Sequence, residues 1–225
     1  MLYAYDKDSG TLVPCQPTEF KTQGFLERFD MEKWVEADPS VLGEDLMVIT
    51  TEYGGFDKTN ERLDVLAIDT EGNLVIVELK RDNSGKNVDL QALKYAAYCA
   101  PMTVDDISGI HADYCGRKGQ KVSRETAQQR IREFVADEEF EELSDKPRVM
   151  LVARQYRSEV TSSAQWLRSY GLDITCIKWD VYELPDKTVV VDTSVLIPQP
   201  ETRDFEMRVQ RKEMAERRLS STMIA

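Results

Sequence analysis

The stretch from Arg62 to Lys80 reads RLDVLAIDTEGNLVIVELK, and it predicts two buried antiparallel strands joined by a tight turn. Residues 62–68 and 74–80 are rich in aliphatic and β-branched side chains, whereas the five residues between them carry the Asp, Gly and Asn that are typical of a hairpin turn. Apolar residues occupy both faces of each strand, so we expect this pair in the centre of a sheet.

Three charged residues interrupt this apolar pattern. Asp64, Glu78 and Lys80 are costly to bury unless they are paired or bind a metal ion. A turn centred on Glu71 brings Asp64 directly opposite Glu78, with Cβ atoms roughly 5 Å apart, and Lys80 shares their face because side chains alternate along a strand. Two carboxylates this close repel each other, and a hard divalent cation such as Mg²⁺ relieves that repulsion.

Spacing alone leaves two interpretations of this cluster open. In the first, Asp64 and Glu78 hold a metal ion, and Lys80 orients or deprotonates a metal-bound water. In the second, Lys80 forms an ordinary strand-end salt bridge with one of the carboxylates. The next predicted helix favours the first interpretation, because Gln91 and Tyr95 lie four residues apart and share one helical face beside the strands. By itself, that spacing equally fits a surface glutamine and a core tyrosine.

Hydrophobic spacing and turn signals extend this hairpin into a mixed α/β domain. Helices are expected at 25–37, 88–100 and 158–170, with two more inside 105–146. Further strands are expected at 46–53, 149–153 and 172–179, followed by a hairpin at 182–192. Residues 1–22 are expected to form a lead-in or hairpin, 23–196 the main domain with a helical insert at about 101–146, and 197–225 a linker and charged helix or tail. The fold class is therefore α/β, with a central mixed β-sheet flanked by helices.

The composition of the 225-residue chain excludes several classes of protein. No run approaches the roughly 18 apolar residues of a membrane span, and the first residues lack the basic and apolar regions of a signal peptide. The four cysteines are scattered and form no CxxC pair, which predicts a reducing, cytoplasmic location. A single histidine, His111, argues against a Cys/His zinc site and against hydrolases that rely on a histidine base.

The net charge of −12 is unevenly distributed along the chain. Residues 27–71 hold thirteen acidic and four basic side chains, whereas residues 117–132 hold six basic and one acidic. Blocks like these are most often solvated surfaces. The net charge does not exclude a nucleic-acid partner, because an acidic pocket can hold a cation that then meets a phosphate, while a local basic block supplies the approach.

The ordered set Asp64, Glu78-x-Lys80 and Gln91-x-x-x-Tyr95 resembles the PD-(D/E)XK, or restriction-endonuclease-like, nuclease superfamily, in the branch whose next helix carries a QxxxY motif. The similarity is greatest to the nuclease domain of NucS-type endonucleases, and it covers about residues 24–180. It rests on residues 31–43, 62–81, 148–153 and 166–177.

The chain also departs from that pattern. Leu63 stands where the superfamily motif has a proline, and the 101–146 insert has no counterpart that we can align. The N-terminal dimerisation and DNA-binding domain of the NucS type has no match either, so mismatch recognition is not implied.

The resemblance implies a restriction-endonuclease-like core and a Mg²⁺-dependent endodeoxyribonuclease that hydrolyses phosphodiester bonds, with Mn²⁺ as a possible substitute. It implies that Asp64, Glu78 and the backbone carbonyl of Leu79 ligate the metal. Lys80 would then act on the attacking water.

Further site residues are implied on the two neighbouring helices. Gln91 and Tyr95 would steady the site and the scissile phosphate. The first helix of the superfamily usually adds a carboxylate, and Glu32 and Glu36 both lie on the appropriate face. We favour Glu32, although a solvent-facing role fits either glutamate.

Basic residues beside the predicted strands are candidate phosphate contacts. Arg62 and Arg81 flank the strands and Lys94 lies on the next helix, although ordinary surface placement explains them equally well. The expected partner is DNA, with no membrane association, and the low net basicity favours a homodimer or another partner that adds grip. The alternative function is a catalytically silent nuclease-fold module that binds nucleic acid or a partner protein.

Overall fold

The computed structural model describes residues 1–56, 62–84, 88–136 and 140–199 of the chain. Its strands are β1 (Tyr3–Asp6), β2 (Thr11–Pro14), β3 (Gln16–Thr18), β4 (Leu46–Tyr53), β5 (Leu63–Asp69), β6 (Leu74–Asn83), β7 (Arg148–Gln155), β8 (Ile174–Glu183) and β9 (Val189–Ile197). Its helices are the π-helical turn η1 (Glu27–Met31), α1 (Glu32–Ala37), the 3-10 turn η2 (Pro39–Leu42), α2 (Val88–Cys99), α3 (Val104–Arg117), α4 (Arg124–Phe134) and α5 (Ser158–Ser169).

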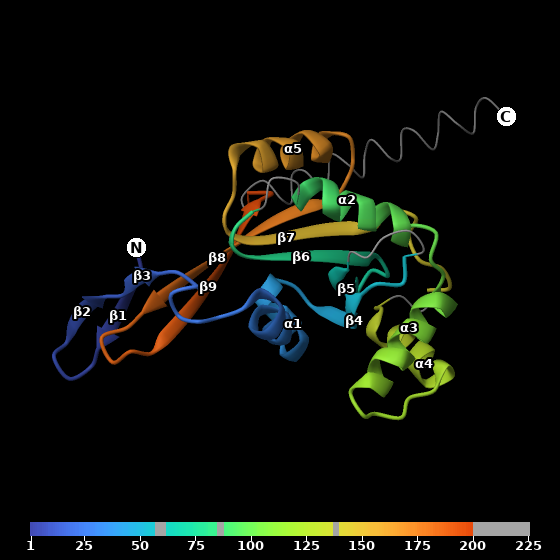
Figure 1. Ribbon diagram of the computed structural model, residues 1–225, viewed down its shortest axis with the longest axis horizontal. Coiled ribbons are helices and arrows are strands. Elements are labelled where there is room, and N and C mark those ends of the chain that lie inside the picture. Colours follow the sequence, from blue (N-terminus) through green and yellow to red (C-terminus); the bar gives the residue numbers. More distant parts are fainter. Residues whose placement is uncertain (57–61, 85–87, 137–139, 200–225) are drawn as a thin grey trace.

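The central sheet is mixed and follows the order β3-β8-β7-β6-β5-β4, with β9 paired to β8. The β4, β5 and β6 strands are antiparallel, whereas β6, β7 and β8 run parallel to one another. Helices α2 and α5 cover one face of the sheet and α1 lies against the other (Figure 1). The prediction of an α/β fold with a central mixed sheet flanked by helices is therefore confirmed.

The two ends of the sheet differ. Helices α3 and α4 pack together at one end, whereas the β1–β2 hairpin lies at the other end beside the long β8–β9 ribbon (Figure 1). Residues 1–22 therefore contain a hairpin, and their last strand, β3, joins the main sheet through β8. Within the described residues, no helix has the length and apolar character needed to cross a membrane.

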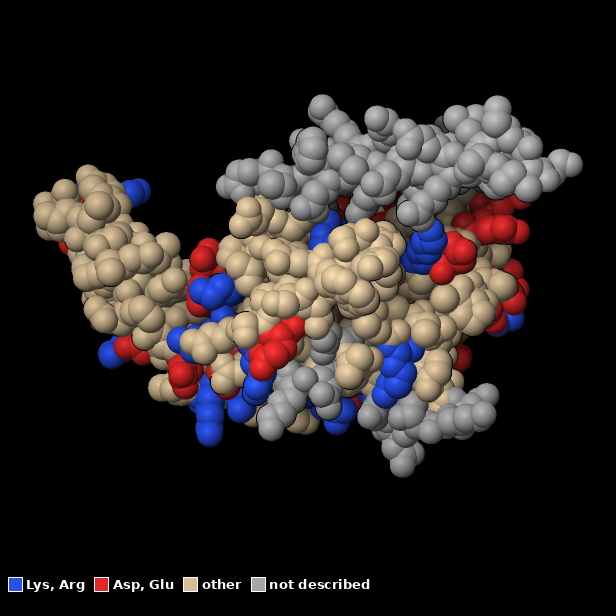
Figure 2. All heavy atoms as spheres, turned by 90° about the horizontal axis from the view of Figure 1, so that it is seen from above, with Lys and Arg blue, Asp and Glu red and all other residues tan. Residues whose placement is uncertain are grey.

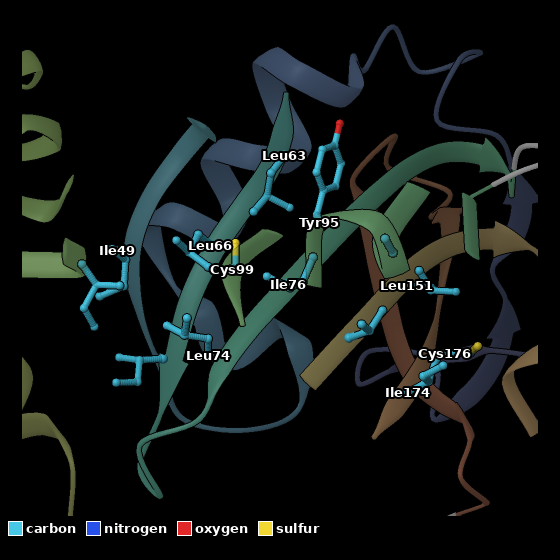
Figure 3. Close-up of a cluster of buried hydrophobic side chains, with 14 of the residues drawn as sticks. Ile49, Leu63, Leu66, Leu74, Ile76, Tyr95, Cys99, Leu151, Ile174 and Cys176 are labelled. Carbon is cyan, nitrogen blue, oxygen red and sulfur yellow. The ribbon is translucent and has the colours of Figure 1, made fainter. Parts of the chain in front are cut away.

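Side-chain alternation along the central strands builds two separate cores. Leu66 and Ile76 point to the side of α2 and α5, and Val65 and Val77 point to the side of α1. Figure 3 shows the first cluster, in which Leu66, Leu74 and Ile76 of the hairpin pack near Cys99 of α2. Because both faces are covered, the strands are buried along most of their length, as their apolar sequence predicts.

The first helix differs from the prediction of one continuous helix over 25–37. The chain instead forms the π-helical turn η1, followed by a short α1 that starts at Glu32. The Asp30 carboxylate accepts a hydrogen bond from the Leu26 amide at 2.7 Å, which fixes the entry to this turn. Helix α1 ends at Ala37, so the predicted helix end at Asp38-Pro39 is confirmed. The Asp38 carboxylate accepts a hydrogen bond from the Ser40 amide at 3.1 Å and so caps the 3-10 turn that follows. The charged helix expected within 197–225 lies almost wholly outside the described residues.

Candidate active site

The β5–β6 hairpin brings its charged residues together at its open end. Val65 lies opposite Val77, so the next positions along the two strands are Asp64 and Glu78, as the sequence predicts. The Lys80 ammonium donates a hydrogen bond to Glu78 Oε1 at 2.7 Å and lies 4.0 Å from Asp64 Oδ2. The three charged residues that interrupt the apolar pattern therefore form one cluster.

The backbone between Glu78 and Lys80 also takes part in this cluster. The Leu79 amide donates a hydrogen bond to Asp64 Oδ2 at 2.8 Å, which fixes the Asp64 carboxylate against β6. Leu79 itself is buried in the core on the α1 side. Metal ligation by the Leu79 carbonyl stays a prediction from the resemblance.

A third strand adds a carboxylate that the sequence analysis missed. β4 pairs with β5 at the residues immediately before and after Glu52, which brings Glu52 level with Asp64. Glu52 has a φ of 53°, in the left-handed region that a non-glycine residue seldom adopts. It forms ion pairs with Arg28 and Arg62. Unusual backbone conformations of this kind cluster at functional sites.

The first helix contributes one of its two candidate glutamates. Carboxylate oxygens of Glu32, Glu52 and Asp64 all lie within 4.8 Å of one another, and the Glu32 side chain is buried. Glu36 instead forms an ion pair at 2.7 Å with Lys118, the residue that follows α3. The structure therefore places Glu32, and not Glu36, beside the charged cluster.

Glu27 of η1 completes the group and was also missed. Its Oε2 atom accepts a hydrogen bond from the Arg81 amide at 2.6 Å, and its Oε1 atom lies 3.5 Å from the Lys80 ammonium. No sequence signal identified Glu27 or Glu52, because both reach the site through contacts between elements distant in sequence. We call the five carboxylates Glu27, Glu32, Glu52, Asp64 and Glu78 the acidic cluster.

Burial and mutual repulsion raise the pKa values of three members of the acidic cluster. Burial, followed by the nearby Asp64 charge, raises the pKa of Glu78 to about 8, although Lys80 opposes this shift. Burial, Asp64 and Glu52 together raise the pKa of Glu32 to about 8. Burial also raises the pKa of Asp64 to about 6, against the opposing effect of Lys80. These carboxylates therefore hold protons more readily than ordinary acids, as expected for anions crowded together away from water.

The acidic cluster fits a divalent cation. Glu78 is fully buried, and its Oε2 atom has no hydrogen-bond partner within the described part of the chain. Within the described residues, three bases, Lys80, Arg28 and Arg62, form ion pairs with four of the five carboxylates, so the fully ionised group carries a formal charge of −2. An ion such as Mg²⁺ would balance that charge, and carboxylate oxygens are its preferred protein ligands.

The QxxxY residues lie on one face of α2, as their spacing predicts. Gln91 Nε2 donates to the Tyr95 hydroxyl at 3.4 Å, and that hydroxyl donates to the Arg62 carbonyl at 3.0 Å. In Figure 3 the Tyr95 hydroxyl points away from the aliphatic side chains. Tyr95 is fully buried, and its hydroxyl contacts the backbone two residues before Asp64.

The three candidate phosphate contacts lie in different settings. The Arg62 side chain is 56% exposed and pairs with Glu52 at 3.2 Å. The Arg81 guanidinium pairs with Asp82 at 3.0 Å. The Lys94 ammonium lies 5.1 Å from the centre of the Tyr95 ring.

Comparison with known proteins found two solved structures that resemble this chain over about two thirds of its length. One is a complex of EndoMS with double-stranded DNA, at 18% identity and a TM-score of 0.36, covering 66% of this chain and 43% of that chain. The other is a repair endonuclease from Pyrococcus abyssi, at 19% identity and a TM-score of 0.36, covering 67% of this chain and 46% of that chain. The chain thus spans less than half of each of those proteins. No family model and no curated protein matches it.

Proposed function

We propose that this chain is a metal-dependent nuclease of the PD-(D/E)XK type that hydrolyses phosphodiester bonds in DNA. The observation that carries the proposal is the fully buried Glu78 beside Asp64. One of its oxygens contacts Lys80, and the other has no hydrogen-bond partner among the described residues. A buried carboxylate oxygen without a partner is destabilising, and a metal ion at this position removes that cost.

Four groups would hold the cation: the carboxylates of Asp64, Glu78 and Glu32 and the backbone carbonyl of Leu79. Glu52 supplies an additional oxygen on the neighbouring strand, within 4.8 Å of the Asp64 and Glu32 oxygens. When bound, the cation supplies an acidified water and offsets negative charge on the phosphate.

Lys80 acts as a positively charged hydrogen-bond donor in this proposal. Burial lowers the pKa of Lys80, but the neighbouring Glu78 and Asp64 carboxylates outweigh that effect and hold the pKa above its ordinary value. A protonated ammonium orients an attacking water through its oxygen and offsets charge that develops on a phosphate oxygen. Its contact with Glu78 fixes its position relative to the metal ligands.

Tyr95 and Gln91 support the site through the backbone at the start of β5. The Tyr95 hydroxyl holds the Arg62 carbonyl, two residues before Asp64, so it fixes the start of β5 against α2. Gln91 in turn holds the Tyr95 hydroxyl. Both residues therefore act in this proposal by keeping the Asp64 carboxylate in place.

An ordinary salt bridge between Lys80 and Glu78 accounts for only part of this arrangement. It explains the 2.7 Å contact, but within the described residues it leaves the second Glu78 oxygen without a hydrogen-bond partner and gives Glu32 no ion-pair partner. A site that served stability alone would be expected to satisfy these groups, because unpaired buried charges are costly.

DNA would meet a surface of mixed charge. On the face shown in Figure 2, Lys and Arg side chains lie interspersed with Asp and Glu. Two bases of the 117–132 block are already paired, Lys118 with Glu36 and Arg124 with Asp105. We therefore expect weak, salt-sensitive binding, strengthened by the metal ion and by a second copy of the chain or another partner.

The test is a panel of labelled DNA and RNA substrates, single-stranded and double-stranded, incubated with Mg²⁺ or Mn²⁺ and with chelator. Metal-dependent cleavage of DNA by the wild-type chain, absent in the Glu78→Ala and Lys80→Ala variants, supports the proposal. Cleavage by either variant at the wild-type rate in a clean preparation contradicts it. Metal binding near Asp64 with no turnover of any substrate would instead indicate the silent nuclease-fold module.

A further inference from the structure

The Glu27 carboxylate is bound as an anion at the edge of the proposed active site. One oxygen accepts the Arg81 amide at 2.6 Å, and the other lies 3.5 Å from the Lys80 ammonium. A backbone N–H and a lysine ammonium together form the donor set that proteins commonly use for phosphate oxygens. Glu27 therefore occupies donors that a nucleic-acid phosphate could also use.

The position of Glu27 allows it to leave these donors. Its side chain is 38% exposed, in contrast to the fully buried Glu78. A depression of about 500 Å³ opens beside it, lined by residues that include Phe29, Arg81 and Asn83. The Glu27 side chain thus has solvent-accessible space to move into without repacking either hydrophobic core.

Charge does not oppose an exchange between Glu27 and a phosphate, because one anion replaces another on the same donors. The Glu27 carboxylate lies 3.5 Å from the Lys80 ammonium, which also contacts Glu78 and Asp64, so its departure removes one negative charge from this group. A phosphate bound in its place brings its own negative charge but also places the substrate next to the metal ligands. The protein would then lose one carboxylate from the cluster when the substrate arrives.

We propose that Lys80 and the Arg81 amide form a phosphate-binding subsite, which the Glu27 carboxylate occupies until a phosphate of the nucleic-acid backbone displaces it. The inference rests on the proposed nuclease function, since it takes the phosphate to belong to the substrate strand. Glu27 in this scheme competes with the substrate, so its removal strengthens binding.

The experiment measures the affinity of labelled DNA for four forms of the full chain, all of which carry Glu78→Gln to remove turnover. They are this parent form and the same form with Glu27→Ala, Glu27→Asp or Glu133→Ala added. Glu27→Ala is expected to bind about 10- to 100-fold more tightly than the parent, the range expected for losing a competing charge-assisted hydrogen bond. Glu27→Asp keeps the charge, but it is too short to reach both donors, so it is also expected to bind more tightly than the parent. A general effect of charge alone would instead leave Glu27→Asp at the parent affinity.

Glu133→Ala is the matched control for the loss of one negative charge. Glu133 is exposed near the end of α4. Two residues beyond that helix, the Ala136 amide donates to the carbonyl of Thr70 at 2.8 Å, and Thr70 directly follows β5 at the end opposite Asp64. Its removal is expected to change the affinity by less than about twofold, because exposed charges at a distance are screened by salt.

Two results would overturn the subsite. One is a Glu27→Ala variant that binds DNA no more tightly than the parent. The other is a Glu27→Asp variant that keeps the parent affinity. If Glu27→Ala also lowers kcat when Glu78 is intact, and does not tighten binding in the Glu78→Gln background, Glu27 only positions Lys80 and the subsite is overturned. Binding is measured without turnover, so this experiment tests the subsite separately from the nuclease proposal. The nuclease proposal is contradicted if the wild-type chain cleaves no substrate.

Discussion

The β5–β6 hairpin carries a charged cluster at each end, and the two clusters are built differently. At the turn end, the Arg148 guanidinium contacts Asp69 at 2.8 Å, Glu44 at 2.8 Å and Asp173 at 2.9 Å. Asp69 also accepts hydrogen bonds from the turn, including the Asn73 amide at 2.8 Å. At the open end, the Lys80 ammonium forms ion pairs with Glu27, Asp64 and Glu78. One oxygen of Glu78 has no hydrogen-bond partner within the described residues.

The comparison separates a structural ion network from a site prepared for a ligand. Burial lowers the pKa of Arg148, but Asp173 and Glu44 outweigh that effect and raise it, so the turn-end cluster favours its charged form. At the open end, the pKa values of Glu32, Asp64 and Glu78 are raised, so these three carboxyls favour their neutral forms more than ordinary carboxyls do. The charged groups at the turn end are paired within the fold, whereas under the proposed function a bound cation balances those at the open end.

The largest expected effect tests the turn-end cluster. Replacing Arg148 with methionine leaves three carboxylates without their common partner, so we expect a loss of about 3–5 kcal/mol in the free energy of unfolding. Urea denaturation measures this change. A loss below about 1 kcal/mol would show that the turn-end cluster does not stabilise the fold, and the contrast between the two ends would disappear.

The next effect tests the open end, where activity and stability should respond in opposite ways. Glu78→Gln and Lys80→Met are each expected to lower cleavage by about 100- to 1000-fold, since each removes a group that acts on the reacting phosphate or water. Thermal unfolding of the metal-free Glu78→Gln variant at about pH 8 is expected to be unchanged or raised, because the buried charge is gone. If the Glu78→Gln variant unfolds at a much lower temperature than the wild-type chain, Glu78 stabilises the fold, as the turn-end cluster does.

A third effect is the pH dependence of metal stabilisation. The carboxyls of Glu32 and Glu78 have an ordinary pKa of 4.5 and a pKa of about 8 in the fold. Between these values the folded chain binds more protons than the unfolded chain, so the metal-free stability falls as pH rises from about 4.5 to about 8. A cation replaces those protons and should therefore raise Tm more at about pH 8 than at about pH 5.5.

The size of this stabilisation follows from mass action. Mg²⁺ or Mn²⁺ at about 100 times its Kd adds about 2.7 kcal/mol to the stability. Scanning fluorimetry with and without the metal at both pH values measures the difference. Equal shifts in Tm at the two pH values, or none at either, would argue against a metal site formed by these carboxylates.

The smallest effect separates the two glutamates of α1. Glu36→Gln removes a partly exposed ion pair with Lys118, so we expect less than about 1 kcal/mol of destabilisation and no change in cleavage. Glu32→Gln is expected to reduce cleavage, because Glu32 lies within the acidic cluster. If Glu36→Gln loses cleavage and Glu32→Gln retains it, the assignment of the first-helix ligand is wrong.

The parts of the fold that the sequence predicts are those governed by local patterns. The β5–β6 hairpin, α2 and α5 have strong periodicity and clear turn residues, and the structure has them close to the expected ranges. The first helix is the main difference, since η1 and α1 replace one continuous helix. Apolar spacing alone did not predict this turn, because Leu26 and Phe29 are 46% and 58% exposed, whereas Met31 and Val35 are the apolar residues that the segment buries.

The sequence by itself determined three central residues of the candidate site. A short turn fixes the register of a hairpin, so Asp64, Glu78 and Lys80 follow from the residues between 62 and 80. Only the tertiary structure decided which residues join them. Glu52 depends on a β4 register that shifts between Val48 and Thr50, and Glu27 depends on how η1 docks against β6. These placements result from packing between elements distant in sequence, which no local pattern encodes.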